Sequence, residues 1–405
     1  MRVNFVMDLK EKALDYHKGG KIGTSILTSV EGKKDLALAY TPGVAVPCLE
    51  IAKDEDKVYD YTSKGNSVAV ISNGTAVLGL GNIGAKASKP VMEGKALLFK
   101  HFAGIDAVDV EIESENVDEI VRTVELISGT YGGINLEDFK APECFEIENR
   151  LKDSLSIPVF HDDQHGTAVV VGAGLLNALK ISSRKIEDVK VVMNGAGSAG
   201  IAIGKMIKNL GVSNIVMCDS KGVISKDREG LHESKMEFAI DSDGTLGDVL
   251  NGADVFIGVS AKDVLTPEML LSMNENPIVF ALANPDPEID WNLAKETRAD
   301  VIIATGRSDF PNQVNNVLGF PGIFRGALDC RAKEINEEMK VAAVNALAGL
   351  VEEPTADRFI IDPFDKRVVV EVAYGVAKAA IDSGVSVKEF DLDGYLNDLK
   401  KRLLK

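Results

Sequence analysis

Two pairs of adjacent carboxylates could hold a metal ion in this chain. Glu137 and Asp138 precede Phe139, and Asp162 and Asp163 follow His161. Adjacent carboxylates repel one another, so a chain that gathers four of them near one cleft has usually supplied a cation to neutralise them. Oxygen ligands of this kind suit Mg²⁺ or Mn²⁺, not Zn²⁺. The pairs predict a divalent metal site, although carboxylates are also common on solvated faces.

Secondary structure supports placing the second pair in a cleft. Residues 156–160 read as a short buried strand that delivers Asp162 and Asp163 to its carboxyl end, where open α/β sheets bind ligands. The i,i+4 spacing of His161 and His165 raises zinc as an alternative. The strand-like residues before His161 and the glycine after His165 disfavour a shared helical face, so zinc is the weaker reading.

A glycine motif predicts a dinucleotide site. It follows an apolar strand (residues 189–193), opens a small-residue helix (201–210), and is succeeded by Asp219 at the end of the next strand. These contexts are the ones that the dinucleotide fingerprint requires. The glycines allow a pyrophosphate to approach the helix amino terminus. The expected cofactor contacts are Asn194, Gly195, Ala196, Gly197, Ser198, Ala199 and Gly200.

Asp219 bears on the choice of cofactor. Its carboxylate could accept hydrogen bonds from the adenosine ribose and would repel a 2′-phosphate, which favours NAD. Lys221 could pair with that phosphate. We therefore expect a preference for NAD with measurable use of NADP.

A second glycine match spans residues 79–84. Lys86, Lys89 and Pro90 follow it, and Pro90 would interrupt the helix that a dinucleotide site needs. We interpret this segment as a loop that lines the substrate cleft.

Apolar periodicity predicts two α/β units. A doubly wound parallel sheet (Rossmann fold) is expected from regular alternation after Val189, with a dinucleotide-binding domain and carboxy-terminal helices over residues 161–405. An amino-terminal α/β substrate and metal domain is expected over residues 1–160. Within it we expect a helix from Leu9 to Tyr16, a loop-rich section to Pro47, and a turn at 132–135. The remaining predicted elements are strands at 67–72, 106–112, 214–218, 255–258, 278–282 and 301–304, and helices at 91–102, 117–128, 167–180, 368–382 and 395–404.

Composition narrows the class of protein. The 405 residues, 45% of them hydrophobic, can form two domains, and the net charge of −17 disfavours nucleic acid as a partner. Four cysteines without a C-x-x-C motif indicate neither a disulfide framework nor a structural zinc site. The amino terminus, with Asp8 and Lys10, lacks the apolar run of a signal peptide, and no apolar stretch is long enough to span a membrane. We expect a soluble cytoplasmic protein.

Seven motifs, in order along nearly the whole chain, resemble the malic enzymes of the compact prokaryotic type. They are Ala39-Tyr-Thr-Pro42, Met92-Glu-Gly-Lys95, Leu136-Glu-Asp-Phe139, the segment His161 to Ala168, Gly195 to Gly200, Ala283-Asn-Pro285, and Asn315-Asn316 with Phe320-Pro-Gly322. The resemblance implies oxidative decarboxylation of L-malate to pyruvate and CO₂, with reduction of NAD(P) and a divalent metal. It also admits decarboxylation of oxaloacetate, and we expect a homodimer.

The resemblance also implies roles for individual residues. Lys95 matches the general base and Tyr40 the general acid. Glu137, Asp138 and Asp163 match the metal ligands, and Asp162 would lie just behind them as a further catalytic residue. Asn284 and Asn315 match the substrate contacts. In the predicted chemistry Lys95 accepts the proton of the malate hydroxyl, and Tyr40 protonates C3 after CO₂ departs. Asn284 is also expected to contact the cofactor.

Two positions depart from the family pattern. Larger members carry an arginine that would pair with the substrate just before the glycine loop, where this chain has Thr75 to Gly79. His161 stands where the larger enzymes commonly have asparagine.

Two other functions fit parts of the sequence. A metal-independent amino-acid dehydrogenase would share the architecture, and the carboxylate trio argues against it. A non-catalytic dinucleotide-sensing protein would keep the glycine motif, and the presence of Tyr40, Lys95 and all the acidic ligands argues against that.

Overall fold

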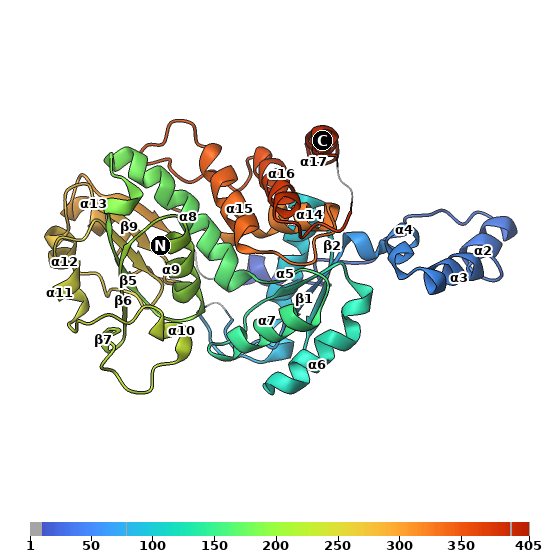
Figure 1. The fold of residues 1–405 in the computed structure, drawn as a ribbon, viewed down its shortest axis with the longest axis horizontal. Helices are drawn as coiled ribbons and strands as arrows, with labels where there is room; N and C mark the ends of the chain where they lie inside the picture. Colours follow the sequence, from blue (N-terminus) through green and yellow to red (C-terminus); the bar gives the residue numbers. More distant parts are fainter. Residues whose placement is uncertain (1–9, 78, 389–390, 405) are drawn as a thin grey trace.

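The chain forms two parallel β-sheets surrounded by helices (Figure 1). The structure is a computed structural model that describes residues 10–77, 79–388 and 391–404. The first sheet has the strand order β2-β1-β3-β4, and all its neighbours run parallel. Its strands are β1 (Ser67–Ser72), β2 (Asp106–Glu111), β3 (Gly133–Leu136) and β4 (Val159–His161). Strand β1 is buried along its whole length, as its apolar β-branched sequence predicts.

The second sheet has the order β10-β9-β8-β5-β6-β7, with only β7 antiparallel to its neighbour. Its strands are β5 (Lys190–Asn194), β6 (Asn214–Asp219), β7 (Gly222–Val223), β8 (Val255–Gly258), β9 (Ile278–Ala281) and β10 (Ile302–Thr305). Strand order reverses at β5, which pairs with β6 on one side and β8 on the other. This arrangement confirms the doubly wound sheet, and ligands are expected at the carboxyl ends beside β5.

Helices cover both sheets and join them. The longer ones are α5 (Ala85–Ala103), α6 (Val117–Ile127), α7 (Glu143–Ser154), α8 (Asp162–Ser182), α9 (Ser198–Asn209), α14 (Phe320–Asp329), α15 (Glu337–Gly349), α16 (Arg367–Asp382) and α17 (Leu392–Leu403). Shorter helices are α10 (Glu233–Met236), α11 (Leu246–Leu250), α12 (Pro267–Ser272) and α13 (Trp291–Thr297). Single 3₁₀ turns are η1 (Glu55–Lys57), η2 (Ser63–Asn66), η3 (Ser128–Thr130), η4 (Ile186–Asp188) and η5 (Asn316–Leu318).

Helix α8 runs between the two sheets (Figure 1). It begins at Asp162, five residues before the predicted start at Thr167, because the carboxylates of Asp162 and Asp163 complement the positive end of the helix dipole. Its buried valines share one apolar core with Phe99 beside the first sheet and Phe280 in the second. The acidic pair therefore lies both at the end of β4 and at the start of a buried helix.

The carboxy-terminal helices pack beside the first sheet. The ring of Phe99 in α5 makes edge contacts with Phe320 and Phe324 of α14, at centroid distances of 4.7 and 5.2 Å. Figure 1 shows α14 and α16 above β1 and β2. The end of the chain thus helps to hold α5 in place.

The predictions around Pro90 and at residues 132–135 were wrong. Helix α5 begins at Ala85, six residues before its predicted start at Val91, and continues through Pro90, which has no N–H to donate to the carbonyl of Lys86. The predicted turn at 132–135 is largely strand β3. Its glycines are there for packing, because a side chain at Gly132 would meet the carbonyl of Lys64 and one at Gly133 the ring of Phe324.

The section predicted as loop-rich up to Pro47 contains helix α2 (Lys33–Ala39) and the start of α3 (Ala45–Lys53). Helix α4 (Val58–Tyr61) follows, and none of the three has a buried residue. We call residues 24–61 the arm, and it projects away from both sheets (Figure 1).

Residues 10–16 are helical. Leu9, the predicted start of this helix, and Asp8, which entered the argument against a signal peptide, lie outside the described residues. Within the described part of the chain, no helix is long and apolar enough to cross a membrane. All four cysteines are free thiols.

Candidate active site

Three carboxylates converge between the two sheets. Glu137 and Asp138 directly follow β3, and Asp163 lies in the first turn of α8. One oxygen from each can be chosen so that the three lie within 4.8 Å of one another. Asp138 adopts a positive φ of 57°, and its backbone N–H donates to Asp163 Oδ2 at 2.7 Å. The parallel pairing of β3 with β4 brings the two acidic pairs together, as predicted.

The donor set fits a hard divalent cation. Burial raises the pKa of Glu137 to about 7 and that of Asp163 to about 6, so gathering their charges is costly without a counter-charge. All three donors are carboxylate oxygens, which Mg²⁺ and Mn²⁺ accept. Glu137, Asp138 and Asp163 are therefore the residues that could hold such an ion.

The two histidines do not join this cluster. His165 Nε2 lies 2.8 Å from Glu148 Oε1, so Glu148 of α7 engages that ring. His161 is fully buried, with its Nε2 3.8 Å from Asp163 Oδ2, and burial lowers its pKa to about 4. Among the described residues, the side chains grouped closely enough to hold a metal ion are the carboxylate trio, and neither histidine belongs to that group.

Lys95 reaches the trio from helix α5. Its Nζ lies 2.6 Å from Asp162 Oδ2 and 2.9 Å from Glu137 Oε1. Burial by itself would lower the pKa of Lys95, but the charges of Asp162 and Glu137 outweigh burial and raise it. Burial in turn raises the pKa of Asp162 to about 7. The structure thus joins the predicted base directly to Asp162.

Gly166 makes room for this contact. It lies one helical turn after Asp162, and a side chain at position 166 would overlap the Asp162 carboxylate. The glycine that closes the His-Asp-Asp-Gln-His-Gly motif therefore permits the position of Asp162 against Lys95.

A cavity of about 910 Å³ opens in front of Lys95 and the trio. Asn284 and Asn315 line it, as the resemblance implied, and so do Ser198 and Ala199 of the glycine motif. The candidate substrate site and the candidate cofactor site are therefore continuous.

The loop at residues 79–84, which carries the second glycine match, also borders this cavity. Gly79 lines it and packs so closely on Asn284 that a Cβ would lie 2.7 Å from the carbonyl oxygen of Asn284. Thr75, near the position of the missing arginine, is buried, and its hydroxyl donates to Asn73 at 2.7 Å. The cationic side chains among the described lining residues, histidine aside, are Lys95 and Lys21.

Tyr40 is not brought to this cavity by its own chain. It follows α2 on the arm and is 69% exposed. The described lining residues include Tyr16 but not Tyr40. Of the predicted catalytic residues, the structure places Lys95 and Asp162 together and Tyr40 apart.

The glycine motif forms the turn between β5 and α9. Gly195 has a φ of 115°, which only glycine adopts easily. A Cβ on Gly197 would meet nothing within 4 Å, so this face is open for a ligand, whereas one on Gly200 would strike the Gly195 carbonyl. These three roles are those of a pyrophosphate-binding turn.

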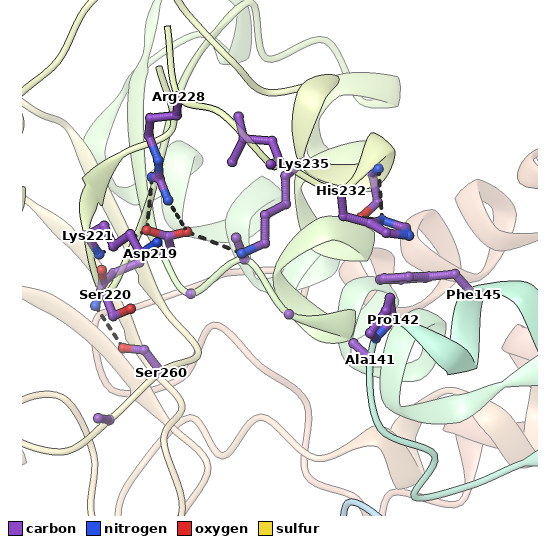
Figure 2. A pocket seen from close by; sticks show the side chains of 18 of the residues that line it. Ala141, Pro142, Phe145, Asp219, Ser220, Lys221, Arg228, His232, Lys235 and Ser260 are labelled. Atoms are coloured by element: carbon purple, nitrogen blue, oxygen red, sulfur yellow. Dashed lines mark hydrogen bonds and ion pairs between the residues drawn. The ribbon is translucent and has the colours of Figure 1, made fainter. Parts of the chain in front are cut away.

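A second cavity, of about 650 Å³, continues from this turn along the end of β6. Asn194, Gly195, Ala196, Gly197 and Asp219 line it. Figure 2 shows Asp219 facing Arg228 and Lys235 on one side, with Pro142 and Phe145 on the other. The start of α7, beside the first sheet, and the end of β6 in the second sheet thus both contribute to the candidate cofactor site.

Comparison with known families decides between the alternatives. Residues 164–381 match the model of the malic enzyme NAD-binding domain, and residues 19–116 and 113–152 match that of the malic enzyme N-terminal domain. The chain belongs to the malic enzyme family. Neither the amino-acid dehydrogenase nor the dinucleotide-sensing alternative is supported.

Individual malic enzymes are similar over most of the chain. A bifunctional malic/malolactic enzyme of Bacillus subtilis is 58% identical over 94% of this chain and 95% of its own length. The NADP-dependent malic enzyme of Escherichia coli is 53% identical over 98% of this chain, which spans only 56% of that relative. The chain likewise spans between 54% and 56% of the length of several other relatives. The crystal structure of malic enzyme from Pyrococcus horikoshii superposes with a TM-score of 0.94 at 44% identity, covering 98% of this chain and 96% of that one.

Three residues at the candidate site were not predicted from the sequence. Glu288, fully buried, accepts the N–H groups of Ser260 at 2.8 Å and Ala283 at 2.9 Å, and so ties together the loops that follow β8 and β9. Its place in Asn284-Pro-Asp-Pro-Glu288, right after a predicted strand, was the available signal. Arg228 lies in the loop after β7 and Lys235 in the short helix α10, and nothing local in the sequence marks either of them.

Proposed function

We propose that this chain catalyses the metal-dependent oxidative decarboxylation of L-malate to pyruvate and CO₂, with reduction of NAD or NADP. The observation that carries the proposal is the single cavity in which Lys95, the carboxylate trio and the glycine motif meet. Decarboxylation of oxaloacetate belongs to the same proposal, because the two carboxylates and the ketone of oxaloacetate would occupy the positions of the carboxylates and the C2 hydroxyl of malate. The four free thiols support action in a reducing cytoplasm.

The protein side chains divide the work of proton transfer and binding. When bound, the divalent cation supplies Lewis acidity toward the C2 oxygen and the nicotinamide supplies the hydride acceptor. With a cation on the trio, Lys95 would lose the support of Glu137 for its ammonium form, and the neutral amine can take the C2 hydroxyl proton. Asp162 holds that amine in position at 2.6 Å. Asn284 and Asn315 can orient a malate carboxylate through their amide groups.

The test is a spectrophotometric assay of NAD and NADP reduction with L-malate, with and without Mn²⁺, accompanied by measurement of pyruvate. We expect malate-dependent reduction only with the metal, and one pyruvate for each cofactor reduced. Cofactor reduction with amino acids but not with malate would contradict the proposal.

We further propose that the working unit is a homodimer in which the arm of one copy completes the site of the other. Tyr40 does not line the cavity that holds Lys95 of its own chain, and no residue of the arm is buried. Large apolar side chains are exposed along it, which is typical of a surface that binds another chain. They are Ile26, Leu27, Val30, Leu36, Leu38, Val46 and Leu49.

Mixed dimers test this arrangement. Tyr40→Phe and Lys95→Ala should each be nearly inactive alone. After the two variants are unfolded and refolded together, one site of each mixed dimer would combine an intact Lys95 with an intact Tyr40. Random pairing makes half of the dimers mixed, so we expect about one quarter of wild-type activity. Each variant refolded alone is the control, and a mixture no more active than these would show that Tyr40 does not act across the dimer.

A further inference from the structure

The carboxylate of Asp219 is fully occupied by protein donors. Its Oδ1 accepts from the Lys221 backbone N–H and from Arg228 Nη1, both at 3.0 Å. Its Oδ2 accepts from Arg228 Nη2 at 2.8 Å and from Lys235 Nζ at 3.2 Å. A carboxylate offers about four acceptor positions, so all of them are used. No acceptor position remains for a ribose hydroxyl.

The charge around Asp219 is positive in balance. Burial would raise the pKa of Asp219, but hydrogen bonds from Arg228, Lys221 and Lys235 lower it to about 2. Of the charged side chains that line the cofactor cavity, Lys221, Arg228 and Lys235 are positive and Asp219 and Glu229 are negative, so positive charge is in excess (Figure 2). An anionic ligand group is favoured here, not repelled.

The chemistry of the two cations suits a phosphate. The planar guanidinium of Arg228 can bind two phosphate oxygens at once, and Lys235 adds a point charge. A phosphomonoester carries about −1.5 to −2 charge at neutral pH, enough to compete with Asp219 for both. Asp219 ends β6, the position where a dinucleotide-binding sheet meets the adenosine ribose.

We propose that Arg228 and Lys235 form a subsite for the 2′-phosphate of NADP, and that this enzyme prefers NADP to NAD. The inference rests on the proposed function, because it assumes that the nicotinamide cofactor occupies this cavity. The sequence-based preference for NAD treated Asp219 as a free acceptor. Its engagement by Arg228 and Lys235 removes that basis.

Arg228 also has a structural contact that a test must separate from ligand binding. Its Nη1 lies 3.1 Å from the carbonyl oxygen of Val223 in β7, so its removal could loosen the loop. Lys235 has no such backbone contact among the interactions of the described residues, and Lys235→Met is therefore the cleaner variant. Lys226→Met is a matched control, since Lys226 lies in the same segment but pairs with Asp241 outside the cavity.

Calorimetric titration with two adenosine nucleotides, in the absence of divalent metal, tests the subsite without turnover. Adenosine 2′,5′-bisphosphate carries the extra phosphate, and adenosine 5′-monophosphate lacks it. We expect the wild type and Lys226→Met to bind the bisphosphate more tightly. Lys235→Met and Arg228→Gln should weaken bisphosphate binding by roughly 10- to 100-fold, the worth of a hydrogen bond between charged groups, and change monophosphate binding little.

The outcomes separate this inference from the function it rests on. Equal affinity of the wild type for both probes, or equal weakening of both by Lys235→Met, would overturn the subsite and leave the malic enzyme activity standing. Binding of neither probe would overturn the placement of the cofactor itself. Turnover gives an independent check, because kcat/KM with L-malate should be higher for NADP than for NAD and should reverse in Lys235→Met.

Discussion

Chelation of divalent metal will abolish malate-dependent reduction of the cofactor, and Mn²⁺ or Mg²⁺ will restore it. The trio of Glu137, Asp138 and Asp163 offers only oxygen ligands, within 4.8 Å of one another, and burial raises the pKa of Glu137 to about 7. Without a bound divalent cation, ionisation of all three buried carboxylates is unfavourable. Activity is measured after exhaustive dialysis against a chelator and after titration with each metal. Full activity in the metal-free enzyme would refute the assignment.

Two neighbouring variants locate the metal within the acidic pair. Asp163→Asn should weaken Mn²⁺ binding strongly, because Asp163 belongs to the trio. Asp162→Asn should leave most of the metal affinity and instead impair turnover, because Asp162 contacts Lys95 at 2.6 Å. Mn²⁺ binding is followed by electron paramagnetic resonance and turnover by the malate assay. Equal loss of metal affinity in both variants would contradict this division.

Most of the candidate site was predictable because its signals are local. Asp162 and Asp163 follow a buried strand directly, and in parallel sheets carboxyl ends meet at one edge. The glycine motif carries its own context of strand, turn and helix. The five parallel strands of the second sheet were predicted to within one residue at each end, since continuous apolar runs in a parallel sheet are buried on both faces, whereas the short antiparallel β7 was not predicted.

What the sequence did not reveal depends on contacts between distant segments. The glycines before Asn135 suggested a turn, whereas the structure uses them to let Lys64 and Phe324 approach β3. Arg228 and Lys235 reach Asp219 only because the segment after β7 folds back over the end of β6. Tyr40 is the sharpest case, since its motif is complete but its own chain leaves it exposed.

Lys95→Ala should reduce malate oxidation by roughly 10²- to 10⁴-fold, the contribution of a positioned proton carrier. The reason is geometric. Lys95 Nζ is held by Asp162 and Glu137 at 2.6 and 2.9 Å and faces the cavity where the substrate would lie. The rate is measured at saturating Mn²⁺, so that altered metal affinity does not limit turnover. Lys100→Ala on the same helix is the control, because Lys100 and its partner Asp106 are both exposed and neither lines the cavity.

Loss of activity alone would not show that Lys95 transfers a proton. Removal of Lys95 also leaves the buried carboxylates of Asp162 and Glu137 without the ammonium group that pairs with them. Small primary amines added to the Lys95→Ala enzyme separate the two effects. An amine that enters the space of the lost side chain can accept the hydroxyl proton, so we expect part of the activity to return, and more with amines of higher basicity. Thermal unfolding with and without Mn²⁺ reports the structural effect separately. If the Lys95→Ala enzyme is folded, binds Mn²⁺ normally and turns over malate at the wild-type rate, Lys95 is not the base. If the rescued rate rises with the basicity of the added amine, the rate that was lost is that of proton transfer at this position.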